Sequence, residues 1–179
     1  AEQGFFVFPV GADKKPLAGS SGWKDGTLDA GKIAAMAWGR AAGIGIATGP
    51  SGLLVLDVDV KHPPVNGYDS LDKLVAAHGQ LPVSRCVKTP SDGGHYYLRR
   101  ASEVPESASV VGDGLDIKAS TGYVVADGSR DAEGKEYRLI VDEPCAPAPG
   151  WLVAKALNGH TKKSATSNGA VDGEIPGGQ

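Results

Sequence analysis

Cysteines, aromatic residues and long apolar runs are all scarce in this sequence of 179 residues. The two cysteines, Cys86 and Cys145, are far apart and form no CxxC pair. This spacing argues against a disulfide framework and against a zinc site, and it favours a cytoplasmic protein. No apolar run reaches the roughly 18 residues that a membrane-spanning helix needs, so we expect no membrane partner.

Basic charge is not in excess either. The sequence has 18 Lys and Arg against 21 Asp and Glu, for a formal net charge of -3. This balance excludes a generally basic surface that coats nucleic acid, although it leaves room for a local basic patch. The motifs G-x-x-x-x-G-K-[ST] and G-x-G-x-x-G are also missing, which excludes P-loop and Rossmann nucleotide sites.

Glycine, by contrast, is abundant, with 26 residues and no collagen-like period. Hydrophobic residues make up 41% of the chain, which is enough for a sizeable core. Only three Phe, three Trp and five Tyr are present. We therefore expect an aliphatic core whose elements are joined by many tight turns.

The spacing of the apolar residues predicts an α+β fold with a largely antiparallel sheet. Strands are expected at residues 4–10, 44–48, 53–60, 83–89, 95–99, 115–119, 123–126 and 136–140. Helices are expected at residues 29–38 with Asp29 as N-cap, after Asp69 or Ser70 as far as His78, and at 151–157 before Asn158-Gly159. Residues 90–94 predict a hairpin turn, and residues 101–113 are expected to form a polar loop.

Composition divides the chain near residue 157. Residues 1–157 carry the apolar pattern and are expected to form one folded domain. Residues 158–179 are rich in Gly, Ser, Thr, Lys and Asn, and this composition predicts a flexible linker.

The segment Leu53–Val60 carries the strongest chemical signal. Its aliphatic residues predict a buried strand, on which Asp57 and Asp59, two positions apart, point to the same face. Adjacent buried carboxylates are costly unless a cation neutralises them, and magnesium bound by oxygen ligands and substrate phosphates would do so. The alternative is the end of a strand whose two acids face solvent.

Two later strands are expected to add polar side chains to this face. Alternation places His95 on one face of the strand at 95–99, and Asp116 and Lys118 on one face of the strand at 115–119. Each residue taken alone also fits an ordinary strand. Together they predict a metal-dependent phosphate site with two ions, built from Asp57, Asp59, His95, Asp116 and Lys118.

These segments together resemble the N-terminal domain of bifunctional DNA primase/polymerases, within the archaeo-eukaryotic primase superfamily. The resemblance covers about residues 4–157. It implies a small αβ unit and an antiparallel sheet related to the RNA-recognition motif, which carries the active site. The segments that match, in chain order, are Phe6–Val10 with Lys15-Pro16, Gly22–Asp25, Gly43–Gly49, Leu54–Asp59, Thr89–Tyr97, Gly114–Lys118 and Gly122–Ala126.

The resemblance implies a role for each site residue. It implies that two Mg²⁺ or Mn²⁺ ions are held by three catalytic carboxylates, which are Asp57, Asp59 and Asp116. It implies that His95 contacts the phosphates of an incoming NTP or dNTP, and Ser91 and Lys118 lie where further phosphate contacts are expected. We therefore predict template-directed nucleotidyl transfer by a primase, a DNA polymerase or both. Asp92, beside Ser91, departs from the family pattern and adds an acid to the expected phosphate loop.

Single-stranded DNA is the expected template. Its phosphates are expected at four basic residues that lie within a short segment, which are Arg85, Lys88, Arg99 and Arg100. The resemblance also implies that residues 158–179 lead into a further C-terminal domain of a larger replication protein, with a fused C-terminal or helicase region as the expected partner.

Two other functions stay open at this point. A sugar-nucleotide transferase would also use an acidic pair such as Asp57 and Asp59 to hold a metal and a diphosphate. A non-catalytic nucleic-acid-binding module would need exposed aromatic side chains on its sheet, for which Tyr97 and Tyr123 are the candidates.

Overall fold

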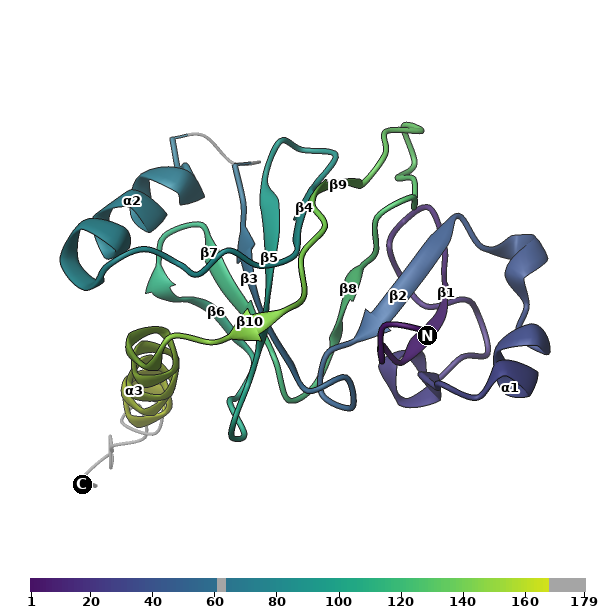
Figure 1. Ribbon diagram of the computed structural model, residues 1–179, viewed down its shortest axis with the longest axis horizontal. Coiled ribbons are helices and arrows are strands. Elements are labelled where there is room, and N and C mark those ends of the chain that lie inside the picture. The colour runs from purple at the N-terminus through teal and green to yellow at the C-terminus, as the bar shows by residue number, and fades with distance from the viewer. Residues whose placement is uncertain (61–63, 168–179) are drawn as a thin grey trace, which may run out of the picture.

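The protein was analysed as a computed structural model, which describes residues 1–60 and 64–167. In the described part of the chain the strands form two sheets that stand side by side (Figure 1). The helices α2 and α3 lie against the larger sheet, and α1 lies beyond the smaller one (Figure 1). The α+β class predicted from the sequence is confirmed.

The smaller sheet is antiparallel and has the order β1-β2-β8. Its strands are β1 (Val7–Val10), β2 (Gly43–Ala47) and β8 (Tyr123–Val125). Three short helices accompany it, which are η1 (Gly22–Asp25), α1 (Ala30–Ala34) and η2 (Trp38–Arg40). The Asp29 carboxylate accepts a hydrogen bond from the Lys32 amide, so Asp29 caps α1 as predicted, although α1 ends before residue 38.

The larger sheet has the order β6-β7-β3-β5-β4-β9, and β10 pairs with β5 in parallel. Its strands are β3 (Leu53–Val58), β4 (Cys86–Lys88), β5 (Gly94–Arg99), β6 (Ser107–Gly112), β7 (Leu115–Lys118), β9 (Arg138–Val141) and β10 (Ala146–Pro147). The central order β7-β3-β5-β4, with α2 (Gly67–His78) connecting β3 to β4, is that of a sheet related to the RNA-recognition motif. The hairpin predicted at residues 90–94 joins β4 to β5.

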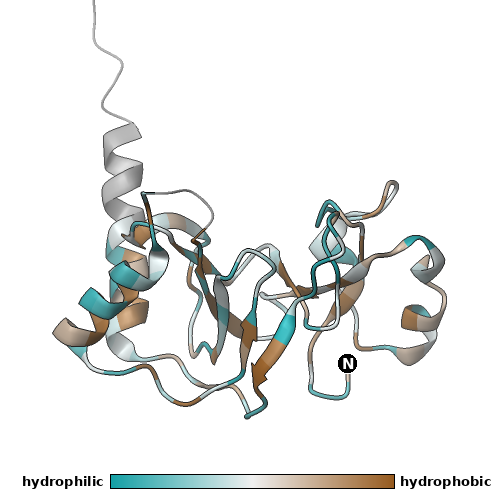
Figure 2. Ribbon diagram, turned by 90° about the horizontal axis from the view of Figure 1, so that it is seen from above, coloured by the Kyte–Doolittle hydropathy of each residue, from teal (hydrophilic) through white to brown (hydrophobic). Residues whose placement is uncertain are grey.

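Alternate residues of β3 belong to two different cores. Leu54, Leu56 and Val58 pack with residues of α2 and α3 (Gly150–Ser167). Leu53 and Val55 face the other way and pack with residues of the smaller sheet. In Figure 2 these central strands are among the most hydrophobic parts of the ribbon. Asp57 continues the second row, so it lies on the face of the larger sheet that looks toward the smaller one.

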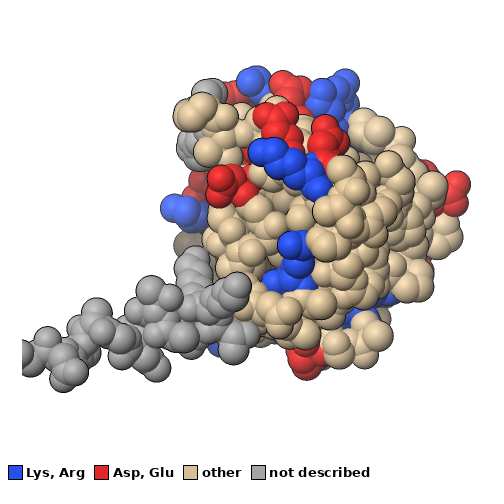
Figure 3. All heavy atoms as spheres, turned by 90° about the vertical axis from the view of Figure 1, so that its left-hand side faces the viewer, with Lys and Arg blue, Asp and Glu red and all other residues tan. Residues whose placement is uncertain are grey.

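The face that carries α2 and α3 is the outer face of the larger sheet. Acidic and basic side chains are intermixed on it (Figure 3). This distribution agrees with the nearly balanced net charge of the whole chain.

Other elements also differ from the prediction, and β4 begins at Cys86 rather than at residue 83. The N-cap of α2 is Asn66, whose side chain accepts a hydrogen bond from the Tyr68 amide, so Asp69 and Ser70 lie inside the helix. Residues 107–112, predicted as loop, form the edge strand β6, whose mostly unburied side chains gave no apolar pattern. Glu136 lies outside β9, which begins two residues later than expected.

The last helix also runs further than predicted. It continues through Asn158 and Gly159 to Ser167, so the first part of the expected linker is helical and the rest lies outside the described residues. Gly159 lies inside the helix, at a point where β6 is so close that a Cβ would be 2.8 Å from the Cβ of Val110. The division of the chain into a domain and a linker therefore stays a prediction.

Gly49, between β2 and β3, is expected to be intolerant of a side chain. A Cβ at this position would overlap the carbonyl oxygen of Ser120, so Gly49→Ala should lower the free energy of unfolding by about 1–3 kcal/mol. Gly39→Ala is the matched control, because no atom lies within 4 Å of the added carbon. Urea unfolding measures both variants, and equal losses of stability would contradict this account of Gly49.

Candidate active site

A cavity of about 200 Å³ lies between the two sheets. Five of the residues predicted as site residues line it, which are Asp57, Asp59, Ser91, His95 and Lys118. Other lining residues come from β8 and from the loop after β1, so both sheets contribute walls. The cavity therefore depends on how the two sheets face each other.

Strand pairing brings three of the polar residues to one point. β3 lies between β5 and β7, and the register places His95 opposite Asp57 on one side and Asp116 opposite Asp57 on the other. Directly opposed residues of antiparallel strands share a face, with Cβ atoms about 4.5–5.5 Å apart. The shared polar face predicted from the alternation is thus present, while the role of each residue stays a prediction.

Asp59 lies just beyond the end of β3. Its amide donates to the carbonyl of Gly114 (2.8 Å), and its carbonyl accepts from the amide of Gly67 (2.9 Å). A Cβ at Gly67 would overlap the Gly114 carbonyl, so this close approach of three chain segments requires a glycine. The backbone bonds hold Asp59 beside Asp57 at the cavity wall.

The surroundings of Asp57 disfavour the ionised form of its carboxyl group. Burial raises its pKa to about 6, and the neighbouring charges of Asp116 and Asp59 add to the increase. The ammonium of Lys118 opposes this shift, and so does that of Lys14. Ionised Asp57 is thus incompletely compensated within the protein, and a divalent cation would relieve this cost.

His95 is buried and neutral at physiological pH. Burial and, to a lesser extent, the positive charge of Lys118 lower its pKa to about 4. Its Nε2 atom is 3.6 Å from Oδ1 of Asp57, so the two side chains are in contact without forming a charged pair at pH 7. The ring also lies 5.8 Å from the ring of Tyr137, centroid to centroid.

Asp116 is held by two contacts within the larger sheet. Its Oδ2 lies 3.3 Å from the Nζ atom of Lys118, and its Oδ1 accepts a hydrogen bond from the amide of Ser109 (3.0 Å). Lys118 thus lies close to the carboxylates of both β3 and β7. This lysine offsets part of the negative charge that the acids create.

The turn between β4 and β5 places Ser91 at the cavity. The amide of Thr89 donates to the carbonyl of Gly93 (3.0 Å), and a Cβ at Gly93 would overlap the carbonyl of Val58. The glycine thus lets the turn pack directly against the end of β3. Asp92 forms an ion pair with Lys88 (2.6 Å), and both of them line a different hollow.

The sequence reasoning missed Lys14 and Tyr137 among the lining residues, and it considered Tyr123 only as a stacking aromatic of a nucleic-acid-binding module. Lys14 has a left-handed backbone (φ 67°), and its carbonyl accepts a hydrogen bond from the hydroxyl of Tyr123 (3.0 Å). The basic pair Lys14-Lys15 in the loop after the first strand was a signal, but alternation within strands could not connect it to Asp57.

The four residues expected to bind the template do not form one patch. Arg85 is buried and pairs with Asp127 (2.6 Å) and Asp142 (3.1 Å). The other three contact acids or backbone oxygens, with Lys88 beside Asp92, Arg99 donating to the Ser51 carbonyl, and Arg100 beside Glu103. Arg85 and Arg99 nevertheless line a common cavity.

The residues of the site fit a hard divalent cation by their chemistry. Asp57 and Asp116 are cross-strand neighbours, and Asp59 is close enough to affect the Asp57 pKa. Carboxylate oxygens are the donors that Mg²⁺ and Mn²⁺ prefer. Within residues 1–60 and 64–167, however, no three His, Cys, Asp or Glu side chains are placed so that they could hold one ion. The ions therefore stay a prediction.

The described residues form an α+β fold with a cavity between its two sheets, lined by both acidic and basic side chains. The family model described as bifunctional DNA primase/polymerase, N-terminal, matches residues 1–151. The chain therefore belongs to the bifunctional DNA primase/polymerase N-terminal family, as the resemblance predicted. The search of curated proteins found no match.

Membership of this family supports a role in primase/polymerase nucleotidyl transfer at the level of the family, with nucleotides and nucleic acid as partners. In the described part of the chain, no helix is long and apolar enough to cross a membrane. The cellular compartment stays a prediction.

Replacing Asp57 is expected to stabilise the metal-free protein. Its folded-state pKa is about 6 against an ordinary value of 3.8, so the proton is bound more tightly in the folded state. The stability contributed by the protonated carboxyl is present below about pH 4 and is lost as the pH rises through 6. Asp57→Asn should therefore raise the free energy of unfolding at pH 7 by about 1–3 kcal/mol.

Urea unfolding in EDTA at pH 4 and pH 7 measures this effect. The gain should appear at pH 7 and shrink at pH 4. Asp113→Asn, which changes an exposed carboxylate in the turn between β6 and β7, is the control and should change stability little. A loss of stability in Asp57→Asn at pH 7 would refute the electrostatic cost assigned to this residue.

Proposed function

We propose that this domain copies a single-stranded DNA template by adding nucleotides to a 3′-hydroxyl, as a primase, a DNA polymerase or both. One observation supports this proposal more than any other. Asp57 lies opposite both Asp116 and His95 on neighbouring strands, at a cavity that Lys118 also lines. Carboxylates for metal ions beside groups that bind phosphate are what nucleotidyl transfer needs.

The three carboxylates that would hold two Mg²⁺ or Mn²⁺ ions are Asp57, Asp59 and Asp116. When bound, such ions would lower the pKa of the 3′-hydroxyl and neutralise charge on the α-phosphate and the leaving pyrophosphate. The oxygen of the 3′-hydroxyl attacks the α-phosphorus, the bond to pyrophosphate breaks, and the hydroxyl proton goes to water. The family match supports this reaction class.

The remaining polar residues of the cavity are proposed to bind the triphosphate. Lys118 on the larger sheet and Lys14 beside the smaller sheet supply positive charge from two sides. Neutral His95 can donate one N–H to a phosphate oxygen without adding charge, and Ser91 can donate its hydroxyl. At about 200 Å³ the cavity is smaller than the 300–1,000 Å³ of typical ligand sites, so we infer that the base lies outside it.

The two alternative functions lack a supporting observation. A sugar-nucleotide transferase gives no reason for Asp116 and His95 to meet at the acidic pair. A stacking module needs exposed aromatic rings, but Tyr97 is fully buried and Tyr123 packs edge-on against Phe8 with ring centroids 5.2 Å apart. A helicase region or further domain beyond residue 157 stays a prediction.

Each metal-binding carboxylate is expected to be essential. Asp57→Ala, Asp59→Ala and Asp116→Ala should each lower primer extension about a thousandfold or more, because the charge on the reacting phosphate is no longer neutralised. The assay supplies primed or unprimed single-stranded DNA, NTPs or dNTPs, and Mg²⁺ or Mn²⁺. Asp113→Ala is the matched control and should retain activity.

Two results would count against the proposal. Failure of the unaltered protein to extend or prime under every combination would remove the polymerase and primase functions. Near-normal extension by Asp59→Ala would remove this residue from the metal site.

Lys14 is expected to act on nucleotide binding. Lys14→Ala removes one ammonium from the cavity and should raise the KM for the nucleotide about tenfold, with a smaller change in kcat. The control is Lys15→Ala, whose side chain is exposed and does not line the cavity. Steady-state extension measures both variants, and equal KM values for Lys14→Ala and the unaltered protein would exclude a phosphate contact.

A further inference from the structure

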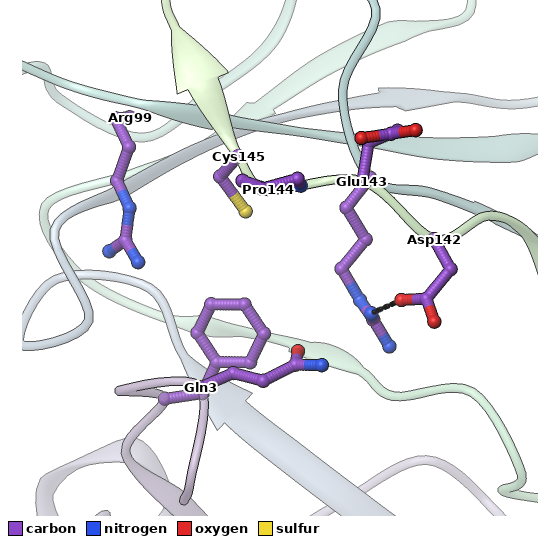
Figure 4. Close-up of a pocket in the computed structure, with 8 residues that line it drawn as sticks. Gln3, Arg99, Asp142, Glu143, Pro144 and Cys145 are labelled. Carbon is purple, nitrogen blue, oxygen red and sulfur yellow. Dashed lines mark hydrogen bonds and ion pairs between the residues drawn. The ribbon is translucent and has the colours of Figure 1, made fainter.

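A second cavity, of about 410 Å³, lies at the other end of the face that carries His95. Figure 4 shows Arg99 on one side of it, Asp142 and Glu143 on the other, and Cys145 between them. Gln3 lies across from Cys145 in the same view (Figure 4). Its remaining lining residues are Phe5, Arg85 and Pro144. The volume falls in the range of sites for small ligands.

The cavity combines an aromatic ring with two guanidinium groups. The central carbon of Arg85 lies 6.0 Å from the centre of the Phe5 ring, and that of Arg99 lies 5.9 Å from it. Unpaired nucleobases stack on arginine planes, which exposed Arg99 offers, whereas the Phe5 ring is itself buried and serves as part of the cavity wall. The amide of Gln3 and the carboxylate of Glu143 offer hydrogen bonds at the rim, as polar edges of a base require.

The two arginines differ in whether their positive charge is already paired with a carboxylate of the protein. Arg85 is paired with Asp127 and Asp142, so its charge is balanced within the protein. Arg99 is exposed and donates to the carbonyl of Ser51 (2.6 Å), and it forms no ion pair among the described residues. Arg99 therefore keeps its positive charge for an anion, while Asp142 and Glu143 repel an anion from the opposite wall.

The position of the cavity relates it to the active site. His95 and Arg99 point to the same face of β5, with fully buried Tyr97 between them. Four residues of an extended strand span about 13 Å, which is also the length of about four stacked nucleotides of one strand. The straight path between the two sites is filled by the core around Tyr97, so a single strand would pass around this core to reach the second cavity.

We propose that the cavity binds one nucleotide of the single-stranded template, with its phosphate at Arg99 and its base between Gln3 and Cys145. This assignment rests on the proposed function, because it takes the strand being copied as the ligand. It also assigns a position at the template to Arg85 and Arg99, two of the basic residues that the sequence analysis predicted to bind it.

The two cysteines allow a direct test with an internal control. Cys145 lines the cavity, whereas Cys86 faces the opposite side of the sheet, beside Tyr96. Burial raises the pKa of both thiols, so alkylation by iodoacetamide is measured at about pH 8.5, by mass spectrometry of each peptide. The rate of alkylation is measured after adding to the protein a single-stranded oligonucleotide, a dNTP with Mg²⁺, or inorganic phosphate.

We expect the oligonucleotide to protect Cys145 from alkylation and to leave Cys86 unprotected. An oligonucleotide at ten times its Kd should slow alkylation of Cys145 about tenfold and leave Cys86 unchanged. Arg99→Gln should raise the concentration needed for half protection about tenfold. Arg40→Gln, which removes the same charge from an exposed site in η2, should not change it.

Three outcomes would overturn the assignment. They are an unchanged Cys145 rate at any oligonucleotide concentration, equal protection of Cys86, and protection by dNTP or inorganic phosphate alone. Failure of this proposal can be told from failure of the proposed function. A protein that extends primers but shows no protection refutes only the template cavity, and protection without extension by the unaltered protein refutes only the polymerase.

Discussion

Successive side chains of β3 point to opposite faces of the sheet, and the rest of the structure depends on this alternation. Leu54, Leu56 and Val58 must face α2 and α3, and Leu53 and Val55 must face the smaller sheet. A slip of one residue would expose both sets, so burial of the aliphatic residues fixes the direction of every side chain on the strand. The place of Asp57 follows from this requirement, because it is the next residue in the second row.

That position creates an imbalance of charge. A carboxylate that follows two buried residues is partly desolvated, and pairing of β3 with β7 adds Asp116 beside it. The protein compensates only in part, through the ammonium groups of Lys118 and Lys14. The proposed divalent ions would neutralise this carboxylate, so Asp57 is a candidate ligand for them.

The two proposed binding regions lie at opposite ends of the face of β5 that packs against the smaller sheet. β5 carries His95 at one end and Arg99 at the other, and Tyr97 fills the space between them. The smaller sheet closes the first region with Lys14 and Tyr123, while Phe5, just before β1, lies at the second. A nucleotide and a template strand would therefore contact the same two sheets, so a shift of one sheet against the other would affect both.

Local pattern and tertiary structure determined different parts of this protein. The sequence by itself determined the alternation in β3, β5 and β7, the hairpin that carries Ser91, and the capping of α1, because each depends on neighbours within one strand, turn or helical end. Together with motifs characteristic of the family, these features were enough to predict the fold class and to place the acids and His95 on one face.

Only the tertiary structure decided the features that join distant segments. The approach of Lys14 to Asp57 depends on the packing of the smaller sheet, and the burial of Arg85 depends on Asp127 and Asp142 from later parts of the chain. Gly159 is a helix-stop signal in the sequence, yet it lies inside α3, where the missing side chain allows β6 to approach closely. Propensity and alternation describe one segment at a time, whereas contacts between remote segments depend on how the sheets and helices pack.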